Sequence, residues 1–430
     1  MRFFHLSDLH LGKTLRGWDL LEDQAYILDL IAAAVREARP DALVIAGDVY
    51  DRPVPPVEAI RLFDSFLRAL REAAPGIKVV VVPGNHDSAG RLSFGASLLA
   101  DSGLAIVTRA EARPVLSLGE GKARVDLWAL PFLTQASADW AALEAAVKAA
   151  GAEDGGAGAA DVGAAAPGAA APDAAAPDAA KPSCRSQQEL MALAAGAIKA
   201  AMDPDAANVL VAHCFASGAM TSESESAFVG AAEQVDAGLF AGFDYVALGH
   251  LHKPQTPAPR LWYSGAPLAY STGEAGTEKE FLSVELVPGA APRVEHVPLV
   301  PKRRVRALSG FFDELLAHPL PAPEREDYIE IRLLDDDLVL NAADRLKALY
   351  PRLLGAQQKA LEAGGGGSGG GSAEGASGRR AARAKGSPDR LQAAGEDFAA
   401  FHAEMTGEAP GESMATLFAE IAREAADASA

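Results

Sequence analysis

Short, largely apolar runs alternate with longer amphipathic stretches over residues 1–135. The runs at residues 2–6, 42–46 and 78–82 have the length and composition of buried strands. Between them, residues 19–39 and 57–74 carry apolar side chains at helical spacing. Strands that alternate with helices in this way predict an α/β fold, in which helices cover both faces of a sheet.

A stretch of Ala, Gly, Pro and Asp at residues 151–183 interrupts this pattern. Because such residues cannot build a core, we expect a disordered insertion or linker there. A helical pattern resumes at residues 187–202. The apolar runs that follow predict strands at residues 208–212, 245–248, 261–263 and 281–287.

The character of the chain changes near residue 300, and a first domain is expected over residues 1–300. Residues 301–360 predict a small α+β domain, and residues 361–388 a flexible Gly- and Ser-rich linker. Residues 389–430 carry two amphipathic helical patterns. Since a helical pair beyond a flexible linker cannot easily bury its apolar face alone, we expect a partner surface for it. The elements predicted in the small domain are a helix at 311–318, a strand at 328–334 and a helix at 342–354.

Composition narrows the classes of protein that fit. The chain has 430 residues, of which 49% are hydrophobic, enough for two or three domains with a sizeable core. Its formal net charge of −19 argues against a protein that coats nucleic acid through bulk charge, but not against an enzyme that contacts a few phosphates. The two cysteines exclude a disulfide framework and favour a reducing cytoplasm. Neither a signal peptide nor a membrane-spanning stretch is expected.

Five short motifs each follow an apolar run. They are SDLH (7–10), AGDVYD (46–51), GNHD (84–87), AHCF (212–215) and GHLH (249–252). Because the strands of a sheet end at a common edge, we expect these distant stretches to meet there. One such motif is weak evidence of a metal site, but five in order argue against a structural coincidence. The candidate ligands are Asp8, His10, Asp48, Asn85, His213, His250 and His252.

These seven side chains are too many for one tetrahedral zinc ion. They suit two divalent ions about 3.5–4 Å apart, bridged by a carboxylate, which polarise a phosphoryl group and activate water. Oxygen and nitrogen ligands without a thiolate favour Mn²⁺ and leave Fe²⁺ and Zn²⁺ open. A thiolate ligand at Cys214 is conceivable, but a small buried residue is favoured there, and His5 is expected to be structural. Gly47, Gly84 and Gly249 are expected to let the backbone turn sharply beside the ions.

The motifs D-x-H, GD-x-x-D, GNHD, H and GH-x-H, in this order, resemble the calcineurin-like metallophosphoesterase superfamily over residues 1–300. The resemblance implies a four-layered metallophosphoesterase β-sandwich flanked by helices. It also implies that Asp48 bridges the ions. The ligands that it implies are Asp8, His10, Asp48 and His252 for the first ion and Asp48, Asn85, His213 and His250 for the second.

The same resemblance implies a catalytic pair that does not bind metal. His86 matches a histidine that stabilises the transition state or protonates the leaving oxygen. Asp51 matches a carboxylate that pairs with this histidine, which would orient the ring and raise its pKa. The archaeal and eukaryotic recombination nucleases often have a histidine at the position of Asp51, so this chain departs from their pattern.

Within the superfamily, HLSDLHLGK, GDVYDRPVPP, VVPGNHDS, YVALGHLHKPQ and YSGAPLAYS resemble the SbcD family of nuclease subunits. The small domain resembles the DNA-capping domain of that family. The tail FHAEMTGEAP…LFAEIAREA resembles the C-terminal helices that bind the SbcC-type ATPase. The resemblance implies a Mn²⁺-dependent 3′→5′ exonuclease on duplex ends and an endonuclease on hairpins, in a bacterial SbcCD double-strand-break processing complex. It further implies a homodimer, whose contact we place between residues 55 and 105.

Two clusters of cations are candidate DNA contacts, although each is also an ordinary solvated face. They are Lys13 and Arg16 after the first motif, and Lys302, Arg303, Arg304 and Arg306 at the start of the small domain.

The competing function is a small-molecule phosphodiesterase, for example of cyclic nucleotides, on the same metal core. The small domain and the C-terminal helices favour the nuclease, because an enzyme for small substrates needs neither. The protein phosphatase branch usually has GNHE, which disfavours that reading. A non-catalytic scaffold is disfavoured by the complete ligand set.

Overall fold

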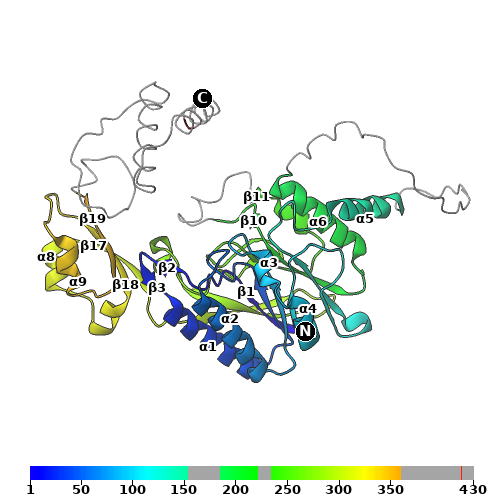
Figure 1. Ribbon diagram of the computed structural model, residues 1–430, viewed down its shortest axis with the longest axis horizontal. Coiled ribbons are helices and arrows are strands. Elements are labelled where there is room, and N and C mark those ends of the chain that lie inside the picture. The colour runs from blue at the N-terminus through cyan, green and yellow to red at the C-terminus, as the bar shows by residue number, and fades with distance from the viewer. Residues whose placement is uncertain (154–184, 221–233, 360–417, 419–430) are drawn as a thin grey trace, which may run out of the picture. The chain divides into compact units, whose positions relative to one another are not determined.

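The computed structural model describes residues 1–153, 185–220, 234–359 and 418 (Figure 1). The chain divides into two compact units, Met1–Gly366 and Gly367–Ala430. The predicted linker and C-terminal helices, and residues 154–183 of the predicted insertion, lie outside the described residues apart from Phe418. None of the described helices is long and apolar enough to cross a membrane.

Two six-stranded sheets form the centre of the first unit. In each, a parallel set of four strands is extended by antiparallel strands at the edges. The first sheet has the order β16 (Arg293–Leu299), β15 (Lys279–Glu285), β1 (Arg2–Leu6), β4 (Ala42–Ala46), β5 (Lys78–Val82) and β6 (Leu104–Ile106). The second has the order β13 (Gln255–Ala258), β14 (Leu261–Tyr263), β12 (Tyr245–Gly249), β9 (Ala207–His213), β8 (Val125–Leu130) and β7 (Leu116–Leu118).

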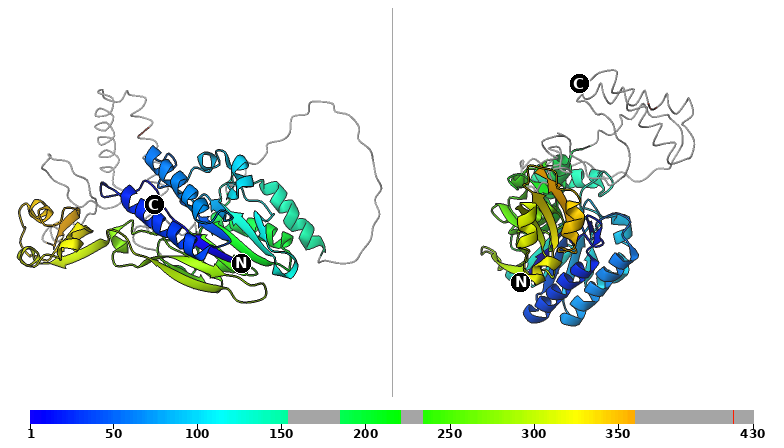
Figure 2. Two further views of the ribbon diagram at one scale, coloured as in Figure 1. Left: turned by 90° about the horizontal axis from the view of Figure 1, so that it is seen from below. Right: turned by 90° about the vertical axis from the view of Figure 1, so that its left-hand side faces the viewer.

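The sheets pack face to face, and helices cover their outer faces. Side chains of both sheets, among them Phe3, Val44, Val209 and Tyr245, share one buried cluster. The side chains on the other face of the first sheet pack against α1 (Leu21–Ala38) and α2 (Val57–Ala73). The second sheet packs in the same way against α5 (Trp140–Glu153) and α6 (Gln187–Ala201). In Figure 1, α5 and α6 lie above the sheets and α1 and α2 below, and Figure 2 (left) views the blue helices from below. This confirms the predicted α/β sandwich of four layers.

The small domain has its own core. Its parallel sheet has the order β17 (Val305–Gly310), β18 (Tyr328–Leu333) and β19 (Leu353–Gln358). The buried cluster includes Phe312 and Leu346, from the short helices α8 (Phe312–Ala317) and α9 (Ala342–Lys347).

Two predicted boundaries were wrong. The helix expected at 342–354 ends at Lys347, and the chain continues into strand β19. Pro351 explains the break, because proline lacks the N–H that a helix interior needs. Residues 151–153, expected to belong to a disordered insertion, are helical, since α5 continues to Glu153 through a run rich in alanine, the best helix former. The remaining elements are β2 (Thr14–Leu15), β3 (Trp18–Asp19), α3 (Ala89–Leu92), α4 (Ala96–Leu99), β10 (Phe215–Ala216), β11 (Gln234–Val235) and the 3₁₀ turns η1 (Ala100–Ser102), η2 (Gly121–Ala123), η4 (Ala237–Phe240), η5 (Thr272–Glu274) and η6 (Ala322–Glu326).

Candidate metal centre

The five motifs meet at the carboxyl ends of the parallel strands. The loops after β1 and β4 run side by side, since Asp8 N donates to Gly47 O (3.0 Å) and His10 N donates to Asp48 O (2.9 Å). The loop after β12 joins them, because His250 N donates to the Asp8 carboxylate (3.0 Å). The predicted convergence of stretches up to 240 residues apart is therefore confirmed, with the second sheet supplying part of the site.

Asp48 lies at the centre of the group. Its Oδ2 is 3.6 Å from His10 Nε2 and 3.5 Å from His213 Nε2. Its Oδ1 accepts a hydrogen bond from the backbone N–H of His86 (2.9 Å). One carboxylate thus faces imidazoles from both sheets, which is the position that a bridging ligand requires.

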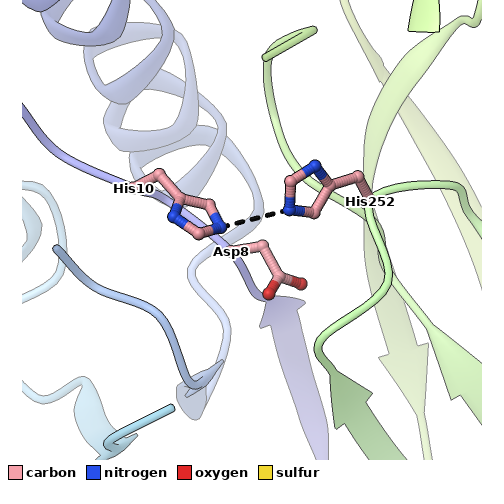
Figure 3. A group of neighbouring side chains, drawn as sticks. All are labelled: Asp8, His10 and His252. Atoms are coloured by element: carbon pink, nitrogen blue, oxygen red, sulfur yellow. Dashed lines mark hydrogen bonds between the residues drawn. The ribbon is translucent and has the colours of Figure 1, made fainter. Parts of the chain in front are cut away.

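The side chains on either side of Asp48 form two groups. In the first, Asp8, His10 and His252 each place a ligand atom within 4.8 Å of the others, and His10 Nε2 is 3.1 Å from His252 Nε2 (Figure 3). In the second, Asn85 Oδ1 is 2.9 Å from His213 Nε2 and 3.0 Å from His250 Nδ1. These are the two sets that the resemblance implies.

Four of these residues have a left-handed backbone. The φ angles are 53° at Asp8, 42° at His10, 50° at Asp48 and 106° at His250. Residues other than glycine rarely adopt positive φ, and such strain gathers at functional sites. These positive φ angles bend the chain sharply just beyond the strand ends, where the candidate ligands converge.

Two glycines let the loops approach closely. A Cβ at Gly84 would lie 2.1 Å from Asp48 Oδ1. A Cβ at Gly47, whose φ is +93°, would lie 2.0 Å from His213 Nδ1. Neither place admits a side chain, so the glycines are required by the packing of the site as well as by its turns.

Hydrogen bonds behind the rings leave nitrogen lone pairs facing the centre. His213 Nδ1 donates to Ala46 O (2.8 Å), so in the neutral ring Nε2 carries the lone pair. His252 Nδ1 faces the Glu274 carboxylate at 3.1 Å and therefore donates as well, so in its neutral ring too the lone pair is on Nε2. His213 Nε2 lies 3.5 Å from Asp48 Oδ2 and His252 Nε2 lies 3.1 Å from His10 Nε2, so both nitrogens face other candidate ligands.

The charge states also suit cations. Burial lowers the pKa of His10 to about 4 and that of His250 to about 3, so both rings are neutral at pH 7. Burial raises the pKa of Asp8 to about 6. Burial opposes ionisation of Asp48 too, but His213, His10 and His86 together lower its pKa to about 2. The buried nitrogens His10 Nδ1 and His250 Nε2 have no hydrogen-bond partner among the described residues.

The residues present therefore fit divalent cations. Carboxylate, amide and imidazole donors converge without a thiolate, a set that suits Mn²⁺, Fe²⁺ or Zn²⁺. Cys214 is 2% exposed and packs in the core beneath the second sheet, as predicted, and burial raises its pKa to about 12.

His86 and Asp51 lie beside the first group, but their contact differs from the expectation. His86 Nδ1 donates to the backbone O of Asp51 (2.9 Å), because a carbonyl can only accept. The carboxylate of Asp51 instead accepts from Lys13 Nζ (2.6 Å) and lies 3.5 Å from His10 Nδ1. The ring of His86 is thus oriented by the main chain and not by the carboxylate.

Two residues that the motif interpretation missed hold the loops. The Asp87 carboxylate accepts from the N–H groups of Val49 (3.0 Å), Tyr50 (2.9 Å) and Gly84 (2.9 Å), and so ties the loop after β4 to the loop after β5. Gln24, in the first turn of α1, donates to His10 O (2.7 Å). Asp87 is the last letter of GNHD, so its motif was a signal, whereas nothing in the sequence marks Gln24.

Four of the six candidate DNA contacts form ion pairs around the junction with the small domain. Arg16 pairs with Glu330 (3.1 Å), and Arg306 pairs with Asp327 (2.6 Å). The Arg304 side chain lies at the same junction and is exposed. The other pairs there are Lys302 with Glu22, and Arg303 with Glu22 and Asp23.

Comparison with known proteins agrees with this geometry. Residues 1–129 match the family model described as calcineurin-like phosphoesterase. Residues 301–385 match the SbcD_C model, described as type 5 capsule protein repressor C-terminal domain. Residues 1–129 therefore resemble a calcineurin-like phosphoesterase domain, and the carboxylate, amide and imidazole groups that converge in the structure are the ligands that a divalent-metal site of such a domain needs.

Two solved structures align with this chain at 12% identity. The protein TT1561 of Thermus thermophilus aligns over 70% of this chain and 99% of its own, with a TM-score of 0.34. A dimetal phosphatase from Danio rerio aligns over 70% of this chain and 96% of its own, with a TM-score of 0.36.

Proposed function

We propose that this protein is the DNA nuclease subunit of an SbcCD-type repair complex. It would degrade duplex ends in the 3′→5′ direction and cut hairpins by hydrolysis of phosphodiester bonds. The observation that carries the proposal is the combination, in one chain, of the phosphoesterase match with the SbcD_C match. A metal core alone would serve a small phosphodiester equally well.

The metal centre supplies the hydrolytic chemistry. Two divalent ions, for which we propose Mn²⁺, would polarise the phosphoryl oxygen and make water nucleophilic near pH 7. The proposed ligands are those predicted from the motifs, with Asp48 as the bridge. The bridging role of Asp48 is supported by the position of its carboxylate between His10 and His213. The cations also neutralise a site lined with carboxylates, which otherwise repels a phosphodiester.

His86 is the proposed general acid. Its Nδ1–H is held by the carbonyl of Asp51, so Nε2 is the nitrogen left to face the leaving oxygen. As a general acid the ring would be protonated on both nitrogens and would give its Nε2 proton to that oxygen. Asp51 contributes through its carbonyl, and through its carboxylate it holds Lys13 beside the first ion group. Lys13 is thereby a candidate to meet a phosphate next to the scissile bond.

The small domain is the proposed DNA-capping domain. The cations Lys302, Arg303, Arg304 and Arg306 lie at the start of its first strand, β17. Arg16, in the β2–β3 hairpin, pairs with Glu330 of its second strand, β18. The pair of Arg16 with Glu330 is partly exposed, and exposed pairs are worth only about 0–1 kcal/mol. Exchange of such a carboxylate for a DNA phosphate therefore costs little free energy.

A second copy of the chain is the proposed partner of an apolar face near α2. Val57, Ile60, Phe94 and Leu98 are 54%, 46%, 90% and 83% exposed. All lie in the predicted contact between residues 55 and 105. Large apolar side chains that are exposed in one segment of the chain are typical of a protein–protein interface. The SbcC-type ATPase is the proposed partner of residues 389–430, and the cytoplasm is the proposed compartment; both rest on the sequence.

A panel of substrates tests the proposal. End-labelled duplex and hairpin DNA would be incubated with Mn²⁺ and the protein, beside bis-p-nitrophenyl phosphate and cyclic AMP, with and without the ATPase and ATP. The proposal expects DNA degradation that is lost in Asp48→Ala and rises with ATPase and ATP. Hydrolysis of the small esters with intact DNA would assign the chain to the small-molecule phosphodiesterases instead.

A further inference from the structure

Glu274 is a buried carboxylate that belongs to none of the five motifs. It ends the 3₁₀ turn η5 and is 4% exposed. Its Oε1 accepts from His252 Nδ1 (3.1 Å), from Ser271 Oγ (3.1 Å) and from Tyr270 N (3.3 Å). A carboxylate with this many partners has a fixed orientation.

Lys279, the first residue of β15, completes the arrangement. Its Nζ donates to Glu274 Oε2 (2.6 Å) and to the backbone O of His252 (3.1 Å), and it is 4% exposed. The Lys279 ammonium thus lies against the same carboxylate that faces the His252 ring. The ion pair thus holds both the ring and the main chain of His252.

The consequence lies on the other side of the ring. Since Glu274 accepts a hydrogen bond from the Nδ1–H of His252, the lone pair of the neutral ring is on Nε2, 3.1 Å from His10 Nε2. His213 uses a neutral carbonyl for the same purpose, whereas His252 uses an ionised carboxylate, which is the stronger partner. A carboxylate behind a ligating histidine fixes its tautomer and increases its basicity.

We propose that Glu274 is a positioning residue that orients His252 and sets the affinity of the first ion site, which contains Asp8, His10 and His252. This inference rests on the metal-centre part of the proposed function and is independent of the DNA substrate. Lys279 supports it by keeping the carboxylate ionised and in place. The alternative is that the ion pair only stabilises the fold.

The test is a Mn²⁺ titration of the full chain by calorimetry, comparing wild type with Glu274→Gln. Glutamine keeps the shape and an acceptor oxygen but removes the charge. We expect one of two Mn²⁺ sites to weaken by about 10- to 100-fold, with the other within about 2-fold of wild type. Asp126→Asn is the matched control, because Asp126 is a carboxylate that is 1% exposed and pairs with Arg124 in the second sheet.

The results of these titrations distinguish a positioning role of Glu274 from a purely structural ion pair. Wild-type affinity at both sites in Glu274→Gln, or equal loss in Asp126→Asn, would overturn the inference. If Glu274→Gln fails to fold because Lys279 is left without its anion, the double variant Glu274→Gln/Lys279→Met removes both charges, and the same single-site loss is expected. Wild type that binds no Mn²⁺ would overturn the inference together with the metal centre. Wild type that binds two ions but leaves DNA intact would overturn the nuclease proposal alone.

Discussion

Hydrogen bonds from Nδ1 of three site histidines determine which ring nitrogen is left to bind a metal ion or a substrate. Ala46 O fixes His213, the Glu274 carboxylate fixes His252, and Asp51 O fixes His86. In all three rings Nδ1 is thus held from behind, so Nε2 is the nitrogen that remains available to a metal ion or to a substrate.

His86→Gln tests the role of the ring that does not bind metal. We expect Mn²⁺ affinity to stay within a few-fold of wild type, while DNA cleavage falls by about 10²-fold or more, as for the loss of a general acid. Parallel calorimetry and cleavage assays measure the two quantities on one preparation, and His296→Gln, at an exposed histidine, serves as the control. Equal loss of binding and cleavage would mean that His86 is a ligand.

His5 confirms the prediction of a structural histidine and makes stability depend on pH. It contacts Tyr245 Oη (3.0 Å) and Leu248 O (3.2 Å), and burial lowers its pKa to about 3 in the folded chain. Below pH 6.5 the unfolded chain binds a proton that the folded chain refuses, so stability is present above pH 6.5 and is lost on acidification.

Urea unfolding at pH 6 and pH 5 measures this loss. Between these values the free energy of unfolding of wild type should fall by about 1 kcal/mol more than that of His5→Gln, because about one proton is taken up on unfolding. Parallel declines in the two proteins would show that His5 is protonated, or accessible, in the folded state.

At the scale of elements, the strands that carry the site were the most predictable part of the fold. β1, β4 and β5 were predicted with their observed bounds, because each is a fully apolar run or nearly so that ends in a polar motif. α5 and strands such as β8 and β16 were not predicted. β16 is an edge strand, so most of its residues are exposed or half-buried, and it contains a proline. Its apolar pattern is therefore too weak to predict a strand.

The convergence of the candidate ligands could be predicted from the sequence because each motif lies at a strand end, and topology alone brings strand ends together. The hydrogen-bond partners of these residues could not. Whether Asp51 turns its carboxylate to His86 or to Lys13, and whether Glu274 reaches His252, depend on side-chain packing between segments far apart in the chain. No periodicity or spacing encodes such contacts.

The close approach of the loops after β4 and β5 gives a prediction for elements. In Gly84→Ala the new methyl group would lie 2.1 Å from Asp48 Oδ1, so the loops must separate. We expect Mn²⁺ binding to weaken by at least about 10-fold, because the bridging carboxylate moves away from its partners. Gly90→Ala is the matched control, since nothing lies within 4 Å of the added Cβ in α3. A Gly84→Ala protein that binds Mn²⁺ normally would contradict the observed loop packing.

At the scale of the whole molecule, the location of the charges reconciles the acidic chain with the proposed DNA substrate. The net charge of −19 belongs to the whole chain, whereas two divalent cations would place about four positive charges at the scissile phosphate. Exposed cations such as Arg304 lie at the junction with the small domain, and the proposed ATPase partner would add basic surface. Affinity for DNA should therefore depend on metal and partner more than on overall charge.

Truncation after Gly371 separates catalysis from assembly. The shortened chain keeps the described part of the first unit, so Mn²⁺-dependent nicking should persist, while co-purification with the ATPase should be lost. Full-length Asp48→Ala gives the reciprocal control, since it should retain the ATPase and lose nicking. A truncated chain that still co-purifies with the ATPase would exclude residues 389–430 as the binding segment.

Anomalous diffraction at the manganese edge, from crystals of the full chain soaked with Mn²⁺, tests the central claim most directly. The account predicts two peaks about 3.5–4 Å apart, one on each side of the Asp48 carboxylate. One peak should lie among Asp8, His10 and His252, and the other among Asn85, His213 and His250. A single peak, or manganese bound away from Asp48, would contradict a two-metal phosphodiesterase centre at the ends of these strands.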